Sequence, residues 1–466
     1  MAAVPPPGTR RASPETVARA GELVGAALVA SPRAGLGDDG CVRAWAASGA
    51  MHLTGPASGP PCVSPAGIAR PLIGLGDALA AVTGGLGAVV SVDALGLAAQ
   101  RAAFTGFGRN GDQSAGGFAH MVRASDGWVV LNLPRPSDAE ALPALVGGTA
   151  PAGDWGEIQL PRPADTEAVP GLVGAPVNAG DWGEIQGRIA AMAAAEVVEQ
   201  ASELGLAVAA IGATRVPLQP WSLRLEGPAR PRSGRAPTVV DLTSLWAGPL
   251  AAGLLAEAGC RVVKVESGSR PDGARRGPAG FFELLNGRKE QVSLELPAPG
   301  AIGQLRELIA GADLVLEASR PRVMQQWGIN PSDVVAAGTV WVSITGHGRS
   351  GLHANRIAFG DDAAVSGGLV VPGDPPMFVG DAIADPIAGL AAASIAAHLL
   401  AEGRAALAEV SLAGASAWVA AHAGAPIDRP VVENGRCWQV ELADGPVAVG
   451  PPATPDRLAA PRMVNT

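Results

Sequence analysis

The chain has 466 residues, of which 48% are hydrophobic and 17% are charged. This composition excludes an intrinsically disordered chain, and the length is enough for about two to four domains. The formal net charge of −9 argues against a general nucleic-acid or membrane-surface binder. The four cysteines form no CxxC pair, so we expect neither a disulfide framework nor a metal site. The Ala/Gly-rich apolar stretches at 75–99 and 386–400 are not typical of membrane spans, and we expect a cytoplasmic protein with no membrane contact.

A faint internal repeat links residues 46–75 to residues 364–390. Both copies have a Ser-Gly turn, a loop rich in Gly and Pro, and Ile-Ala-X-Pro before an apolar helix. The residue X is Arg70 in the first copy and Asp385 in the second. We interpret residues 1–110 as a degenerate copy of an active segment that has lost its carboxylate.

The next region, residues 111–226, has the pattern of an α+β small domain. Residues 120–133 predict a β-hairpin around Asp126-Gly127, and residues 190–205 predict a helix that stops at a glycine. Within this region, residues 133–159 and 160–186 form a tandem 27-residue repeat. Two copies are too few for a solenoid, so we expect a surface insertion.

The second half of the chain has the pattern of a doubly wound α/β domain. A Pro/Arg-rich linker is predicted at 227–237, followed by this domain at 238–425 and a C-terminal extension at 426–466. Short β-branched runs alternate with helical stretches, as in parallel strand–helix–strand units. The predicted strands are 238–243, 260–267, 312–319 and 341–345, and the predicted helices include 248–258 and 300–311. The expected fold class is therefore α/β, with a Rossmann-like domain and the small α+β domain.

Common nucleotide and hydrolase motifs are missing from their expected contexts. No GxGxxG follows the strand at 238–243, and the chain has neither GxxxxGK[ST] nor GxSxG. These gaps argue against a dinucleotide enzyme, a P-loop nucleotidase and an α/β-hydrolase.

Six segments of the second half, taken in order, resemble landmarks of the family III CoA-transferases. That family includes formyl-CoA transferase, carnitine CoA-transferase and the alpha-methylacyl-CoA racemases. The segments are VVDLTSLWAGP (239–249), GCRVVKVES (259–267), FFELLNGRKEQVSLEL (281–296), ADLVLEASRPRVMQQWGI (312–329), WVSITGHGRSG (341–351) and GDAIADPIAGLAAA (380–393). The family normally places its small domain after the main domain, so the order here resembles a rearranged or fused form.

The resemblance implies an acyl-CoA:carboxylate CoA-transferase that works through a covalent aspartyl intermediate. Its substrates would be an acyl-CoA and a carboxylic acid acceptor, with no tightly bound cofactor, and the family's usual form implies a homodimer. The implied nucleophile is Asp385. Asp385 followed by Pro386 also fits a helix N-cap with proline in the first helical position. We expect the neighbouring Asp361, Asp362 and Asp381 to be turn or loop residues.

The resemblance also implies a CoA-binding set. The pantetheine and adenine would lie along loops that follow the strands, and arginines would hold the phosphates. The implied residues are Trp246, Ala247, Ser267, Arg275, Lys289, Leu294, Ala318, Arg320 and Arg322. For each arginine, a solvated surface role is an equal alternative. Lys289 and Lys264 are the two lysines of the chain, and both lie on landmark segments.

Two alternatives to CoA transfer come from the same resemblance. The racemase branch pairs its aspartate with a histidine just before the Ser-Gly turn, but residues 357–360 contain no histidine, which favours transfer. The rearranged order and Arg70 leave open a non-catalytic CoA-binding homologue.

Overall fold

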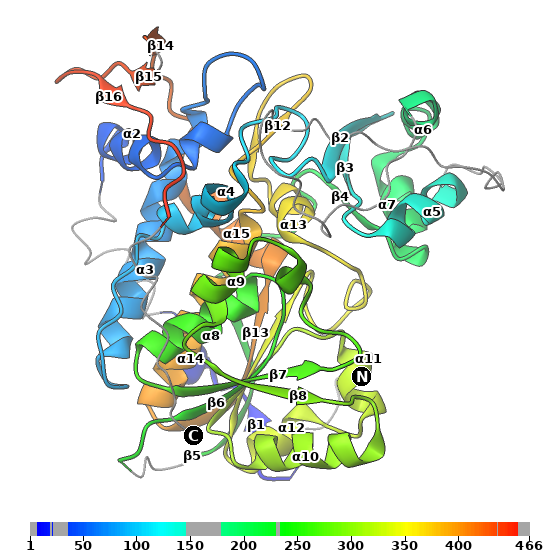
Figure 1. The fold of residues 1–466 in the computed structure, drawn as a ribbon, viewed down its shortest axis with the longest axis vertical. Coiled ribbons are helices and arrows are strands. Elements are labelled where there is room, and N and C mark those ends of the chain that lie inside the picture. Colours follow the sequence, from blue (N-terminus) through cyan, green and yellow to red (C-terminus); the bar gives the residue numbers. More distant parts are fainter. Residues whose placement is uncertain are drawn as a thin grey trace.

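The computed structural model describes residues 7–18, 21, 36–145, 179–229, 234–435 and 437–454. Figure 1 shows a large sheet with helices on its faces, a small sheet beside it and a short C-terminal sheet at the opposite side. Most of the tandem repeat at 133–186 lies outside the described residues.

The large sheet contains six parallel strands in the order β8-β7-β6-β9-β10-β13. This is the Rossmann order, so the predicted doubly wound α/β fold is confirmed. Its elements are β6 (Thr238–Leu242), α8 (Ala247–Glu257), β7 (Arg261–Ser267), α9 (Ala279–Asn286), β8 (Glu290–Leu294), α10 (Pro299–Ala310), β9 (Leu314–Glu317), α11 (Pro321–Gln326), α12 (Pro331–Ala336), β10 (Val340–Thr345), α13 (Gly360–Ser366), α14 (Ala384–Ala401), β13 (Arg404–Ser411) and α15 (Leu412–His422).

The first half of the chain extends this sheet. Strand β5 (Ser222–Ala229) pairs antiparallel with β13, and β1 (Arg10–Arg11) pairs antiparallel with β5. Residues 227–229, which we expected to begin a linker, therefore end a strand. Ala229 lies opposite Arg404, and the register shifts between this pair and the pair of Glu226 with Ala406.

A small antiparallel sheet carries the predicted hairpin. Strands β2 (Ala119–Ala124) and β3 (Gly127–Asn132) pair directly, and β4 (Ala207–Ala210) pairs with β3. The sheet packs against α5 (Pro136–Leu145), α6 (Ala179–Ile189) and α7 (Ala194–Glu203), which contains most of the predicted helix at 190–205. The short strands β11 (Val370–Val371), β12 (Met377–Phe378), β14 (Val431–Asn434), β15 (Cys437–Val440) and β16 (Val447–Ala448) complete the described strands.

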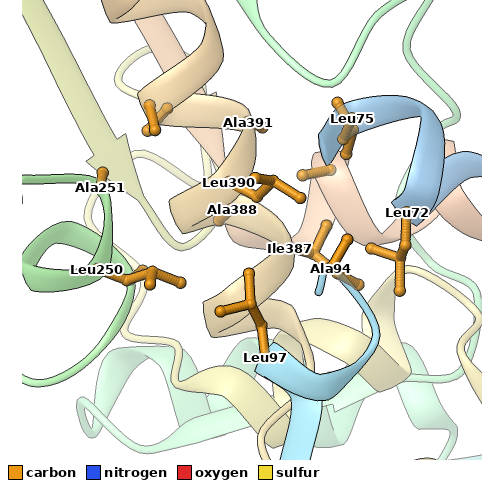
Figure 2. Close-up of a cluster of buried hydrophobic side chains, with 14 of the residues drawn as sticks. Leu72, Leu75, Ala94, Leu97, Leu250, Ala251, Ile387, Ala388, Leu390 and Ala391 are labelled. Carbon is orange, nitrogen blue, oxygen red and sulfur yellow. The ribbon is translucent and has the colours of Figure 1, made fainter. Parts of the chain in front are cut away.

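Helix α14 lies in the centre of the main apolar core. It is apolar on all sides, as is typical of a buried helix, and it packs against α8 and against α3 (Ala69–Thr83) of the first half. Figure 2 shows Leu72 and Leu75 of α3 beside Ile387 and Leu390 of α14. The rest of the first half includes α2 (Asp38–Ala47), α4 (Gln100–Thr105) and short 3-10 turns.

Two described segments, Ser64–Thr83 and Ala384–Ala401, are long and apolar enough to cross a membrane. Most of each segment is buried inside the protein, 67% of the first and 83% of the second. Burial of this extent is what core helices show, and it accounts for their composition without a membrane.

Both lysines are buried, Lys264 within β7 and Lys289 directly before β8. Lys264 Nζ donates to the Thr243 carbonyl at 2.9 Å and to Asp272 Oδ2 at 2.9 Å. Lys289 Nζ has three acceptors at 2.9 Å, which are Asp241 Oδ2, the Pro249 carbonyl and Asn286 Oδ1. These bonds hold the loop between β6 and α8. They also occupy all three donors of Lys289, which argues against the CoA contact expected for this residue.

Lys289→Met tests this network. We expect the free energy of unfolding to fall by about 3–5 kcal/mol, because the variant leaves the buried Asp241 carboxylate without its cation. The matched control is Arg261→Met, which removes a cation from an exposed pair with Glu290 on the same sheet and should cost about 0–1 kcal/mol. Urea denaturation measures both. Equal costs for the two variants would contradict the proposed role of the network.

Candidate active site

The candidate site lies where the strand order reverses, between β6 and β9. Ligands of doubly wound sheets bind in the crevice outside the carboxyl ends of the strands at this point. The loop after β6 contains Trp246, and the loop after β9 contains Ala318 and Arg320. Leu245 has a φ of 70°, a strained value for a non-glycine residue, and its backbone N–H donates to Asp272 Oδ1 at 2.9 Å. The Asp272 carboxylate thus holds the first loop in its unusual conformation.

Asp385 is the second residue of α14 and is half-buried. Its expected role as an N-cap is wrong, because the cap position belongs to Ile383 and carries no side-chain hydrogen bond. Pro386 is accordingly the third helical residue and not the first. In the described part of the chain, no donor to the Asp385 carboxylate is observed. This leaves its oxygens available to a substrate.

Two glycines allow neighbouring segments to lie very close to Asp385 and its helix. A Cβ atom on Gly360 would lie 2.4 Å from Asp385 Oδ2 and 2.4 Å from the Ala382 carbonyl oxygen. A Cβ atom on Gly389, one turn along α14 on the same face as Asp385, would lie 2.6 Å from the Ala247 carbonyl oxygen. The start of α13 and the start of α8 therefore both approach the first turns of α14 closely.

Three further aspartates surround Asp385. Asp361 and Asp362 lie in the first turn of α13, so the expectation of loop positions is wrong for them; Asp381 does lie in a turn, just before α14. All three are buried. Asp361 accepts from the Ala382 backbone N–H at 3.0 Å, and Asp362 accepts from Asn132 Nδ2 at 2.8 Å. The second oxygen of Asp362 has no hydrogen-bond partner.

Burial dominates the titration of these groups. It raises the pKa of Asp361 to about 6 with help from the Asp381 charge. Burial also raises the pKa of Asp362 to about 7, against the hydrogen bond from Asn132. The pKa of Asp385 rises to about 7 for the same reason, with Arg101 opposing the rise and the other aspartates adding to it. Near neutral pH, Asp385 is therefore divided between its acid and its carboxylate form.

Arg101, in α4 of the first half of the chain, is the cation of this cluster. Its Nε donates to Asp381 Oδ2 at 2.9 Å, and its Nη2 contacts the other oxygen of the same carboxylate. Its guanidinium carbon lies 5.4 Å from the centre of the Trp246 ring. Burial lowers the pKa of Arg101, but contact with Asp381 more than offsets this and raises it above its ordinary value. Sequence reasoning missed Arg101, which belongs to none of the six landmark segments.

The apolar members of the predicted CoA set are buried. Trp246 and Ala247 are buried at the start of α8, and Leu294 is buried at the end of β8. The Trp246 ring packs edge-on against Phe281 with centroids 5.2 Å apart, and its indole N–H has no acceptor. Ser267 Oγ donates to the Leu296 carbonyl at 3.1 Å and so helps to hold the turn after β8.

The predicted phosphate-binding arginines lie farther out. Arg320 and Arg322 are exposed, as is Ala318. The pKa of Arg320 is lowered by partial burial and by the nearby charges of Arg322, Arg135 and Arg270. A group of like charges of this kind is relieved by binding an anion. Arg275 is less free for this role, because it pairs with Glu266 at 2.8 Å and stacks 4.2 Å from the centre of the Phe282 ring.

The small sheet closes one side of the site. Besides the bond from Asn132 to Asp362, the Val208 carbonyl accepts from Arg356 Nη2 at 2.7 Å, and the Val365 carbonyl of α13 accepts from the Gly212 N–H at 3.0 Å. Across the described ranges, no group of three or more His, Cys, Asp or Glu side chains has the arrangement to hold a metal ion.

The matching family model and the similar curated proteins are all named as CoA-transferases or acyl-CoA transferases. Residues 237–431 match the model of CoA-transferase family III. The succinyl-CoA–D-citramalate CoA-transferase of Chloroflexus aurantiacus is 28% identical over 168 residues, which are 33% of this chain and 42% of that protein. A probable fatty acyl-CoA transferase of Mycobacterium tuberculosis is 32% identical over 191 residues, which are 37% of this chain and 47% of that protein. The chain thus spans less than half the length of these curated relatives.

A solved structure of a hypothetical protein from Mycobacterium tuberculosis is 28% identical, with a TM-score of 0.39 and coverage of 46% of this chain and 65% of that chain. The six landmark segments at 239–393 all lie inside the region that matches the family model. The family resemblance expected from the sequence is confirmed for residues 237–431, which match the model of CoA-transferase family III.

Proposed function

We propose that this protein is an acyl-CoA:carboxylate CoA-transferase in which Asp385 is the nucleophile. The observation that carries the proposal is the Asp385 carboxyl group. It is half-buried in the first turn of α14, has no protein donor among the described residues and has a pKa of about 7. A carboxylate with these properties is weakly solvated and ionised in part at neutral pH, as nucleophilic attack requires.

The names of the relatives support transfer of CoA between carboxylic acids. They include a succinyl-CoA:glutarate CoA-transferase of Mus musculus and an acetyl-CoA:oxalate CoA-transferase of Acetobacter aceti. We infer an acyl-CoA donor and a carboxylic acid acceptor for this chain as well.

The reaction begins when an Asp385 oxygen attacks the thioester carbonyl carbon. The carbon–sulfur bond breaks, CoA leaves as its thiolate, and a mixed anhydride of Asp385 and the acyl group remains. The thiolate then attacks the aspartyl carbonyl carbon, which releases the donor acid as a carboxylate and leaves an aspartyl-CoA thioester. The acceptor carboxylate attacks this thioester and expels the thiolate again. Attack of the thiolate on the acceptor's carbonyl carbon yields the new acyl-CoA and regenerates the Asp385 carboxylate.

Two different groups of residues would bind the pantetheine arm and the phosphates of CoA. The pantetheine arm would pass the buried Trp246 and Ala247 on its way to Asp385. The phosphates would lie at the exposed group of Arg320 and Arg322, where they relieve the repulsion between like charges. A homodimer and a cytoplasmic location stay predictions from the family resemblance.

Asp385→Asn tests the nucleophile. The variant should form no acyl or CoA adduct at position 385, and CoA transfer should fall by roughly three orders of magnitude or more, because an amide cannot attack the thioester. Peptide mass spectrometry after incubation with succinyl-CoA or acetyl-CoA, with hydroxylamine as the trap, detects the adduct. The control Asp374→Asn removes an exposed carboxylate and should leave adduct formation unchanged. Transfer at the wild-type rate by Asp385→Asn overturns the proposal. So does exchange of the α-proton with solvent deuterium when no acceptor acid is present, because that exchange is the chemistry of a racemase.

Gly360→Ala tests the close contact at the nucleophile. The added methyl group would lie 2.4 Å from Asp385 Oδ2, so the carboxylate must move and adduct formation should slow by about 10-fold to 100-fold. Gly303→Ala is the matched control, because the same change in α10 meets no atom within 4 Å. Rates of adduct formation at equal protein concentration compare the two. An unchanged rate in Gly360→Ala would show that Asp385 does not react from the observed position.

A further inference from the structure

The turn before α14 is held by residues of the first half of the chain. Thr54 Oγ1 accepts from the Gly380 backbone N–H at 2.9 Å, and Arg101 binds both oxygens of Asp381. Ala382, the next residue, has a φ of 44°, which a non-glycine residue adopts only when its surroundings hold it. Thr54 and Arg101 both lie outside residues 237–431, the region that matches the family model.

Arg101 also contacts the loop between β6 and α8. Its guanidinium carbon lies 5.4 Å from the Trp246 ring centre and 5.8 Å from that of Phe107, both within the range of cation–π attraction. One side chain therefore connects the loop at the switch point with the turn that leads into α14.

The charged groups that act on the Asp385 carboxyl come from three elements. They are Arg101 of α4, Asp361 and Asp362 of α13, and Asp381 of the turn before α14. Arg101 is the one cation among these four, and its influence is the largest of the four while that of Asp381 is the smallest.

We propose that Arg101 is a positioning residue for Asp385, through which the first half of the chain completes the active site of the second half. Arg101 fixes Asp381 and Trp246 and places a positive charge beside the carboxylate that attacks the thioester. The catalytic meaning of this role rests on the function proposed above. The effect of Arg101 on the ionisation of Asp385 can be measured without any substrate.

The direction of each effect follows from the charges. Burial raises the pKa of Asp385 to about 7, and Arg101 opposes that rise. Arg101→Gln should therefore raise the pKa of Asp385 further, whereas Asp381→Asn should lower it, because the charge of Arg101 is then no longer neutralised by its partner. Arg101→Lys keeps the charge and should change the pKa little. A residue with only a structural role would not produce shifts of opposite sign.

The experiment is pH-dependent labelling of Asp385 by a water-soluble carbodiimide with an amine, read by peptide mass spectrometry. A carbodiimide reacts with the protonated carboxyl group, so labelling should fall with rising pH and reach its midpoint near 7 in the wild type. We expect the midpoint to rise by about one pH unit in Arg101→Gln and to fall by about one unit in Asp381→Asn. The double variant should lie between them.

A second measurement connects this shift to the reaction. With acyl-CoA present, Arg101→Gln should form the Asp385 adduct about fivefold more slowly at pH 7 and should recover when the pH is raised above the new midpoint, because a midpoint one unit higher lowers the ionised fraction at pH 7 from about one half to about one eleventh. Arg43→Gln is the matched control, since this arginine lies in the same half of the chain and pairs with the exposed Asp444.

The outcomes separate the two proposals. Midpoints that do not move, or that move in the same direction in Arg101→Gln and Asp381→Asn, overturn the role of Arg101 whether or not the enzyme is active. Absence of an adduct in the wild type, with the labelling midpoints moving as expected, overturns the proposed function and leaves the charge effect of Arg101 established.

Discussion

The site depends on how closely α14 packs against its neighbours. Gly389 of α14 and Gly360 of α13 let α8 and α13 approach the start of α14 at distances that a Cβ atom on either glycine would not permit. Protein interiors have few voids, so a contact of this kind restricts how far the helices can shift relative to one another. The position of Asp385 is therefore set by the close packing of the surrounding backbone, which the glycines permit, and not by hydrogen bonds to its own oxygens. This arrangement combines a fixed position with oxygens that remain free to react.

The same packing creates an electrostatic problem. Four carboxyl groups lie within a largely buried region, where an unpaired charge is costly. Arg101 and Asp381 neutralise each other as a buried pair, and burial raises the pKa values of the other three groups toward neutrality. The net charge close to the reacting atoms is therefore small near neutral pH. The exposed arginines that can accept phosphates, Arg320 and Arg322, are not among the charges that act on Asp385, so the two kinds of charge are kept apart.

The sequence predicted what local patterns determine. The β-branched runs at 238–243 and 341–345 became the parallel strands β6 and β10, and the Asp126-Gly127 turn formed its hairpin. The expected N-cap position of Asp385 is wrong, and the expected CoA contact of Lys289 stays a prediction that the three protein acceptors of its ammonium group argue against. A lysine on a landmark segment does not show which way its donors point, and an Asp-Pro pair does not show where a helix starts. Arg101 could not have been found in this way, because its ion pair joins residues 280 positions apart.

The internal repeat indicates that the carboxylate at position 385 is not needed to start its helix, because the equivalent position in the first copy is Arg70. Arg70 and Asp385 are each the second residue of a helix, in α3 and α14, and these two helices pack against each other. Arg70 donates to the carbonyls of Leu36 and Ala423, so in the first copy this position serves the local structure. A helix of this kind evidently begins without an acid. What distinguishes the second copy is the group of charges around Asp385, and the cation of that group, Arg101, comes from α4 of the first half of the chain. The two halves of the chain thus contribute differently, since the first contributes packing and a positive charge and the second contributes the carboxylate.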